Sequence, residues 1–227
     1  MRRYFALFAF LVLAGCNGSS CTSGCITVDG DGPTIHGSGK IQTETRPVGP
    51  FSAVQVLSAG KVTIERTGGD SLTLTGDDNL LALFTSTVKD GTLYLSHVKG
   101  KAFEGKMPTY HITVANLRAI SINDAGSVDA SKLDSDALSL AISGAGRIRA
   151  AGRTNALTVS VSGAGLVDAS ELQAKSANVV LSGVGNADVN ASETLDAKIT
   201  GVGRLQYVGS PKITSQISGV GKLVQKK

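Results

Sequence analysis

Four charged residues of the C-terminal half recur at a nearly constant spacing and could act together. They are Asp129, Arg149, Asp168 and Asp188, each 19 or 20 residues after the one before. If successive repeats stack, Arg149 lies between two carboxylates and Asp168 lies next to Asp188. Clustered carboxylate oxygens suit hard cations, so one interpretation is a weak cation site. The interpretation that we favour is a solvated charge ladder, whose exposed ion pairs contribute about 0–1 kcal/mol each.

A second set of residues could form a binding surface. Before each of three repeated glycine pairs, outward positions alternate with apolar ones and carry mostly small polar side chains: Ser139, Ala141, Ser143, Thr158, Ser160, Ser162, Asn178, Val180 and Ser182. Such a flat, hydroxyl-rich face could receive a glycan or an envelope protein. It could equally be the solvated face of a β-sheet, and both interpretations stay open.

No grouping of residues in the sequence indicates nucleophilic catalysis. The three histidines, His36, His97 and His111, fall in a loop-like region, at a strand end and at a strand start. Catalysis needs acid, base or metal groups that converge in a sheltered pocket. We therefore predict a non-catalytic binding, adhesion or scaffolding protein without a cofactor. The alternative is a polysaccharide lyase or hydrolase acting on acidic glycans, because β-helices often host such enzymes.

The element that must position these residues is a repeat marked by glycine pairs. The letters SGAG occur at residues 143–146 and 162–165, and SGVG at 182–185 and 218–221. The second glycine anchors each repeat, and the frame extends back beyond these motifs to give seven anchors: Gly60, Gly126, Gly146, Gly165, Gly185, Gly203 and Gly221. From Gly126 onward the repeat length is 18–20 residues, which is in the range of solenoid coils.

Apolar residues keep a fixed phase relative to these anchors. Two positions after each anchor, as at Val128, and four positions before it, as at Ile142, the residue is always apolar, and its neighbours are mostly polar. Alternation with period two indicates half-buried strands. Because the phase is the same in every repeat, we expect stacked coils rather than a hairpin meander. The sequence therefore predicts an all-β parallel β-helix, a three-sided solenoid with short strands joined by bends.

The glycines have a structural role in this interpretation. A corner needs a residue that tolerates positive φ, or one without a side chain against the coil above. Asp124 and Ser58 replace the first glycine in two repeats, whereas the second glycine is always present. We therefore expect substitution of the second glycine, as at Gly146, to be more destabilising than substitution of the first, as at Gly144.

The N-terminal half is less regular and predicts a cap over one end of the solenoid. Asp90-Gly91 lies between two apolar runs and indicates a hairpin turn. A short helical turn is expected after Gly76, capped by Asp77 or Asp78. We place the β-helix domain at residues 41–227.

The first residues predict a targeting signal rather than part of the fold. Arg2 and Arg3 precede a short apolar run that ends in Leu-Ala-Gly-Cys at residues 13–16. This pattern resembles a bacterial lipoprotein signal, which implies cleavage after residue 15 and lipidation of Cys16. An ordinary signal peptide is the alternative. Residues 16–40 are rich in Gly, Ser and Thr and predict a flexible tether. The expected location is the cell envelope, with the lipid in the outer membrane, at its periplasmic or surface face.

Two further cysteines, Cys21 and Cys25, lie in this predicted tether. An exported protein permits a disulfide between them; two free thiols are the other open alternative, and a metal pair is disfavoured because no histidine has ligand spacing. The net charge of +4 falls to +2 without Arg2 and Arg3. This balance excludes the basic character typical of nucleic-acid-binding proteins.

Several motifs together resemble a known family. They are Arg46, Phe51-Ser-Ala-Val-Gln-Val, Gly76-Asp-Asp-Asn-Leu, Asp90-Gly-Thr-Leu-Tyr-Leu and the repeated Ser-Gly-x-Gly corners. In their order and spacing, over roughly residues 44–226, they resemble the head GIN domain family of putative autotransporter adhesins. The resemblance implies a right-handed β-helix in a secreted or surface-anchored bacterial protein. Arg147, Leu166, Arg204 and Lys222 stand where members of this family more often have Asp or Asn.

Overall fold

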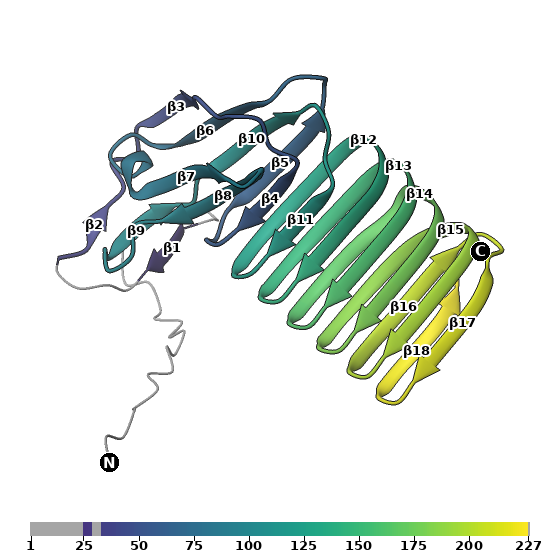
Figure 1. Ribbon diagram of the computed structural model, residues 1–227. Helices are drawn as coiled ribbons and strands as arrows, with labels where there is room; N and C mark the ends of the chain where they lie inside the picture. Colours follow the sequence, from purple (N-terminus) through teal and green to yellow (C-terminus); the bar gives the residue numbers. More distant parts are fainter. Residues whose placement is uncertain (1–24, 29–32, 227) are drawn as a thin grey trace, which may run out of the picture.

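The structure, a computed structural model, describes residues 25–28 and 33–226. In these residues it is an all-β protein in which stacked coils form a long solenoid with a cap at its N-terminal end (Figure 1). Four long strands each make most of one coil, and three shorter strands complete the C-terminal end: β12 (Ala125–Ile142), β13 (Ala145–Val161), β14 (Ala164–Leu181), β15 (Val184–Ile199), β16 (Val202–Val208), β17 (Lys212–Ile217) and β18 (Val220–Gln225).

The coils stack in parallel and in the register that the glycine spacing predicts. The anchor glycines pair directly from coil to coil, as Gly126 with Gly146 and Gly146 with Gly165. The same ladder continues through Gly185 and Gly203 to Gly221. The predicted parallel β-helix is therefore confirmed.

Each full coil has three straight segments. In β14 the buried residues are two positions apart within a segment, but three apart at two places, between Ala169 and Leu172 and between Ala174 and Ala177. Because side chains alternate sides along a strand, an interval of three keeps the next residue inside only if the chain bends. The third corner is the glycine pair. The three-sided coil is thus visible in the burial pattern itself.

The interior is a stack of aliphatic rows. One row runs through Val128, Ile148, Val167, Ala187 and Leu205, and every member is at most 1% exposed. Full burial of a Val, Leu or Ile side chain stabilises the fold by about 1.5–3 kcal/mol. Repetition of such rows makes the core of the coils aliphatic, whereas the buried aromatic residues Phe51, Phe84, Phe103 and Tyr110 all lie before residue 125.

The corner glycines are required for space and not for positive φ. None of the glycines in the repeated Ser-Gly-x-Gly or Thr-Gly-x-Gly corners has a positive φ. A Cβ at Gly144 would lie 2.2 Å from the carbonyl oxygen of Asp124, and one at Gly163 would lie 2.0 Å from that of Gly144. At the second glycine the space is less tight in these two corners: the nearest atom is 2.7 Å away at Gly146 and 2.8 Å away at Gly165. The expected order of sensitivity is therefore reversed at these corners.

The N-terminal cap continues the sides of the solenoid and then closes them with antiparallel strands. Its elements are β1 (Cys25–Val28), β2 (Ile35–His36), β3 (Ile41–Arg46), β4 (Ala53–Val56), β5 (Lys61–Arg66), β6 (Ser71–Asp77), the 3₁₀ turn η1 (Leu81–Leu83), β7 (Phe84–Lys89), β8 (Thr92–His97), β9 (Phe103–Lys106), β10 (Thr109–Val114) and β11 (Ala119–Ile122).

On one side of the molecule the ladder runs from β12 through β5 and β10 to the antiparallel strands β6 and β3. On another side it runs from β12 through β11, β4 and β8 to the antiparallel β7. The β7–β8 hairpin turns at Asp90 and Gly91, whose φ values are 50° and 71°, as a type I′ turn requires. The predicted hairpin is confirmed.

The predicted capping of the helical turn is wrong. The residue before η1 is Leu80, and no side chain caps this turn. Asp77 is instead buried, and its carboxylate accepts hydrogen bonds from the N–H groups of Gly39 and Lys106 at 3.1 and 3.3 Å. The absent side chains at Gly37 and Gly105 leave room for this carboxylate. Asp77 therefore links the loop at Gly39 to the end of strand β9.

Part of the range expected to be a tether belongs to a small sheet. Strands β1 and β2 both pair with β9. Phe103 of β9 packs edge-to-face on Phe84 with 5.3 Å between ring centroids, so aromatic residues close this end of the core. The ordered fold thus starts before residue 41.

The sequence-based predictions for Cys16 and Cys21 lie outside the described residues. Cys25 begins β1, and its side chain is also outside the description. Among the described residues, no helix has the length and apolar character needed to cross a membrane.

Candidate binding faces of the solenoid

The charge ladder exists in the predicted register. Asp129 of β12 pairs with Arg149 of β13, Arg149 with Asp168 of β14, and Asp168 with Asp188 of β15. These residues point outward from the side that follows the glycine corners, which we call the charge-ladder face. Sequence spacing positioned these four residues correctly because the coil register is set by the glycines.

Arg149 does not use its two ladder neighbours as hydrogen-bond partners. Its Nη2 donates to Oε1 of Glu171 at 2.5 Å, across the bend of the next coil. This hydrogen bond, with the charges of Glu171, Asp168 and Asp129, raises the pKa of the Arg149 guanidinium. The nearest cation to Asp168 is Arg147, with 4.0 Å between Nη2 and Oδ2. Arg149 therefore lies between Asp129 and Asp168, as predicted, but its hydrogen bond reaches across the bend to Glu171.

The two neighbouring carboxyl groups of the ladder have opposite environments. Partial burial alone would raise the pKa of Asp168, but hydrogen bonds from Ser170, at 2.7 Å from its Oγ, and the charges of Arg149 and Arg147 lower it below its usual value. Desolvation raises the pKa of Asp188, and the charge of Asp168 raises it further. Lys226 and Arg204 only partly offset this effect.

A cation site has little support at this ladder. Among the residues that the structure describes, no three Asp, Glu, His or Cys side chains come close enough together to hold a metal ion. Asp168 and Asp188 provide one pair of carboxylates, and each has basic side chains nearby. Hard cations need more oxygen ligands than such a pair offers.

The hydroxyl-rich positions also come together as predicted. Ser139, Thr158 and Asn178 form one row, and Ala141, Ser160 and Val180 form the next. A third row at the corners consists of Ser143, Ser162 and Ser182, whose N–H groups bond to carbonyls of the preceding coil. We call this surface, on the outward side of the segments before the corners, the hydroxyl face. The small side chains are confined to these three coils, because in β15 the first two rows continue with Asp196 and Lys198.

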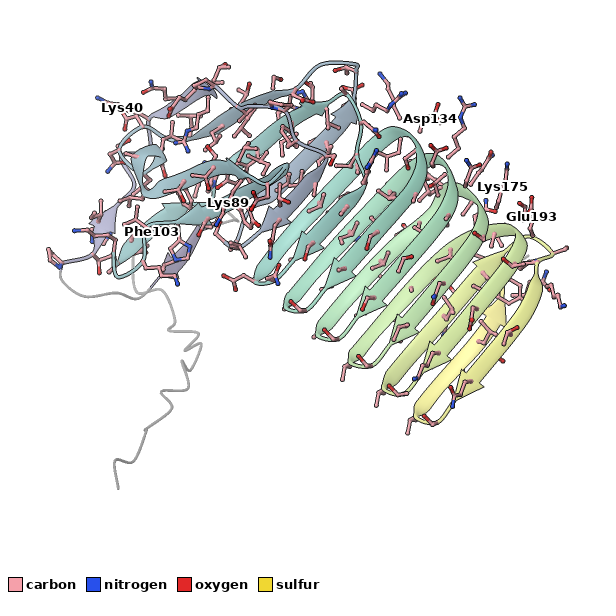
Figure 2. The ribbon with its side chains drawn as sticks, viewed as in Figure 1. Lys40, Lys89, Phe103, Asp134, Lys175 and Glu193 are labelled. Atoms are coloured by element: carbon pink, nitrogen blue, oxygen red, sulfur yellow. The ribbon has the colours of Figure 1, made fainter. Side chains whose placement is uncertain are left out.

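A feature that the sequence analysis missed lies at one margin of the hydroxyl face. An open hollow of about 570 Å³ is formed where the cap meets the first coils, and polar and charged side chains line most of it: Arg66, Asn116, Arg118, Asp134, Ser135, Asp136, Ser139 and Thr158. Arg153 donates to Asp134 at 2.7 Å, and Arg66 lies 3.9 Å from the same carboxylate. Asp134 stands at the bend edge of the solenoid (Figure 2).

One signal in the sequence could have found part of this hollow. The repeat frame extends back to Gly60, and β5 pairs with β12 in that frame, so that Glu65 lies beside Ser131. Arg66 must then lie beside the bend that carries Asp134. Arg118 could not be found in this way, because it lies outside the repeat frame in the segment before β11.

The histidines lie apart from each other and from these faces. His36 pairs with Glu104, His97 packs against Phe103, and His111 lies in β10 beside Thr63. In the described part of the chain, no histidine side chain forms a hydrogen bond with a serine, threonine or cysteine side chain.

Comparison with solved structures supports the same fold. A putative adhesin from Bacteroides fragilis NCTC 9343 is 28% identical, with a TM-score of 0.71 over 85% of this chain and 100% of its own. A putative lipid binding protein from Parabacteroides distasonis ATCC 8503 is 19% identical, with a TM-score of 0.56 over 86% and 100%. A putative adhesin from Parabacteroides merdae ATCC 43184 is 16% identical, with a TM-score of 0.53 over 86% and 99%. No curated protein matches the chain.

A family model described as "Putative auto-transporter adhesin, head GIN domain" matches residues 50–211. The match covers most of the cap and all the coils up to β17. It includes the glycine corners and the bends described above. The chain therefore belongs to the head GIN domain family.

Proposed function

We propose that this protein is a non-catalytic binding module of the cell envelope, and that its hydroxyl face receives a glycan or an envelope protein. The observation that carries the proposal is the alignment of hydroxyl and amide side chains in two rows on three neighbouring coils, with a row of small side chains, Ala141, Ser160 and Val180, between them. Aligned coils repeat about every 4.8 Å, so a chain-like ligand meets similar donors and acceptors at each coil. A rigid surface of this kind loses little entropy when it binds.

The geometry of the charge-ladder face supports a binding role over catalysis. Asp168 and Asp188 lie on an outward row. Next to them, Glu171 accepts a hydrogen bond from Arg149, and Ser170 donates one to Asp168. General acid–base chemistry instead favours groups that converge in a sheltered pocket. The coils after Gly126 vary in length by only two residues and so lack inserts to wall such a pocket.

The cell-envelope location rests on the predicted signal and on the relatives. The Leu-Ala-Gly-Cys motif and the apolar run before it support lipid anchoring at Cys16. The Bacteroides fragilis relative carries the name of an adhesin, which fits a surface or envelope protein. We propose that the anchor holds the solenoid at the outer membrane.

A binding screen tests the proposed function. The chain from residue 16 with Cys16→Ser is applied to a glycan array and to envelope protein fractions. Asn178→Arg, which alters the hydroxyl face, should weaken any specific binding. Asn186→Arg introduces the same side chain on the charge-ladder face and should leave that binding unchanged. Equal binding by both variants would show that the ligand site does not lie on the hydroxyl face.

An enzymatic assay tests the alternative function. The same protein is incubated with pectin, alginate and peptidoglycan, with and without Ca²⁺. We expect no turnover. Sustained product formation that is lost in Asp168→Asn and Asp188→Asn would establish a polysaccharide-processing enzyme and refute the binding module.

A further inference from the structure

The two ends of the solenoid are finished differently. At the N-terminal end the antiparallel strands β3 and β7 and the β1–β9–β2 sheet close the fold, and Phe84 and Phe103 are almost fully buried there. At the C-terminal end, β17 and β18 are the last strands of their ladders, and nothing in the described residues lies beyond them (Figure 1).

The open end exposes the interior rows of the solenoid. Ile213 and Ile217 of β17 pair with Leu195 and Ile199 of β15. The two β15 residues are at most 1% exposed, whereas Ile213 is 38% exposed and Ile217 is 44% exposed. Leu223 of β18 continues the same interior and is only partly buried. Terminal repeats of solenoids need a polar cap for solubility, and this end has an apolar one.

The open end also offers backbone hydrogen-bonding groups. Within the described residues, β17 pairs only with β15, and β18 only with β16. Each strand therefore has one edge with free N–H and C=O groups, which is a template for a further strand. Addition of an extended segment to such an edge is a common mode of peptide recognition.

The charged side chains near the C-terminal end are all basic. From residue 197 to the end of the sequence there are six basic side chains and no acidic one: Lys198, Arg204, Lys212, Lys222, Lys226 and Lys227. Residues 1–196 carry 16 basic and 18 acidic side chains, so the positive balance of the whole protein comes from the last coils. Asp196 of β15 lies one strand in, beside Thr214, but the terminal strands β17 and β18 themselves carry Lys212 and Lys222 and no acidic residue. An occupant of the open end therefore meets a positive potential.

We propose that the C-terminal coil is the docking site for an acidic, extended segment of a partner protein, which adds a β-strand to the free edge of β17. The apolar side chains of the segment cover Ile213 and Ile217. Its acidic side chains lie on the outer side, beside Lys212 of β17, with Lys198 of β15 one strand away behind Gln216. This proposal uses a different surface from the hydroxyl face and does not depend on it.

Charge favours this occupant over a second copy of the chain. Stacking two open ends would bring Lys212 of β17 and Lys222 of β18 of each copy toward one another, and like charges across an interface oppose association. An acidic segment instead gains from the same field. Lysines on an edge strand also discourage pairing with neutral or basic strands, which makes the edge selective.

The test uses the chain from residue 16 with Cys16→Ser and a fluorescent synthetic peptide. The peptide has about nine residues, a usual strand length, in which Glu alternates with Val or Ile. We expect saturable binding measured by fluorescence anisotropy, with ¹⁵N amide shifts centred on β17. A peptide with Lys in place of Glu should bind at least about tenfold more weakly. A peptide with Pro at alternate positions cannot form the ladder and should not bind.

Matched variants locate the site. Lys212→Glu should weaken binding of the acidic peptide by about tenfold, because one attractive charge becomes repulsive. Lys89→Glu, at an exposed position of β7 in the N-terminal cap (Figure 2), makes the same charge change and should have no effect. Equal affinity for the Glu and Lys peptides, or amide shifts confined to other strands, would overturn the proposal. So would a concentration-dependent dimer that is lost in Ile217→Glu, since a second copy would then be the occupant.

Discussion

Asp188 of β15 lies in register with Asp168 of β14, and the two carboxyl groups have pKa shifts of opposite sign. Asp168 is held ionised by Ser170 and nearby arginines, whereas Asp188 is partly desolvated beside that negative charge. Two adjacent members of one ladder thus affect stability in opposite directions.

The raised pKa of Asp188 predicts that removal of this carboxyl group stabilises the protein, and that the stabilisation depends on pH. Between the unfolded and the folded pKa, the folded state binds more protons at Asp188, so ionisation at higher pH opposes folding. Asp188→Asn should therefore raise Tm at pH 7, and the gain should disappear at a pH below the unfolded pKa of about 3.9. Thermal unfolding at the two pH values measures this.

Asp168→Asn provides the comparison for that prediction. The lowered pKa of Asp168 contributes stability that is present above its unfolded pKa and is lost as the pH falls through the folded value. The variant should lower Tm at pH 7. Equal effects of the two substitutions would show that the ladder environment does not distinguish them.

Substitution of the two glycines of one corner should have unequal effects. A Cβ at Gly163 meets the carbonyl oxygen of Gly144 at 2.0 Å, and backbone cannot move without shifting a coil. A Cβ at Gly165 meets the Cγ2 of Ile142 at 2.8 Å and the carbonyl oxygen of Gly146 at 3.0 Å, so its overlap with the neighbouring coil is smaller. We expect Gly163→Ala to cost about 3 kcal/mol and Gly165→Ala about 1 kcal/mol. Urea denaturation measures both; a lower midpoint for Gly165→Ala would contradict this order.

The buried carboxylate of Asp77 should stabilise the cap. Asp77→Ala leaves the N–H groups of Gly39 and Lys106 without their acceptor and should cost about 1–3 kcal/mol. Limited proteolysis should then cut near residues 37–40 sooner than in the unchanged chain. Asp136→Ala removes an exposed carboxylate at the bend and serves as the control. If the two variants are cut at the same rate near residues 37–40, Asp77 does not stabilise this part of the cap.

The proposed lipid anchor is tested by fractionation. Cys16→Ser should move the protein out of the membrane fraction or block its maturation, because the thiol is the acceptor of the lipid. Cys21→Ser keeps Cys16 and should remain in the membrane fraction. Unchanged fractionation of Cys16→Ser would refute the lipoprotein prediction.

The sequence by itself determined the coil architecture and the register of both faces. The repeat spacing and the apolar phase predicted the stacking of Gly126 on Gly146 and of Asp129 on Arg149, and both are present. These features are local and periodic: each coil buries the same positions against the next, so one repeat predicts its neighbours. The Asp90-Gly91 turn was predictable for a similar reason, since two residues define it.

Only the tertiary structure decided the relations between segments that the repeat does not connect. The partner of Arg149 is Glu171, which lies off the ladder in the next bend. Asp77 accepts hydrogen bonds from Gly39 and Lys106, 38 and 29 residues away in sequence, instead of capping the turn beside it. The requirement for glycine at position 163 comes from the carbonyl of Gly144 in the preceding coil. In each case the deciding contact joins residues whose approach is set by the packing of other elements, and such distances have no signature in a single stretch of sequence.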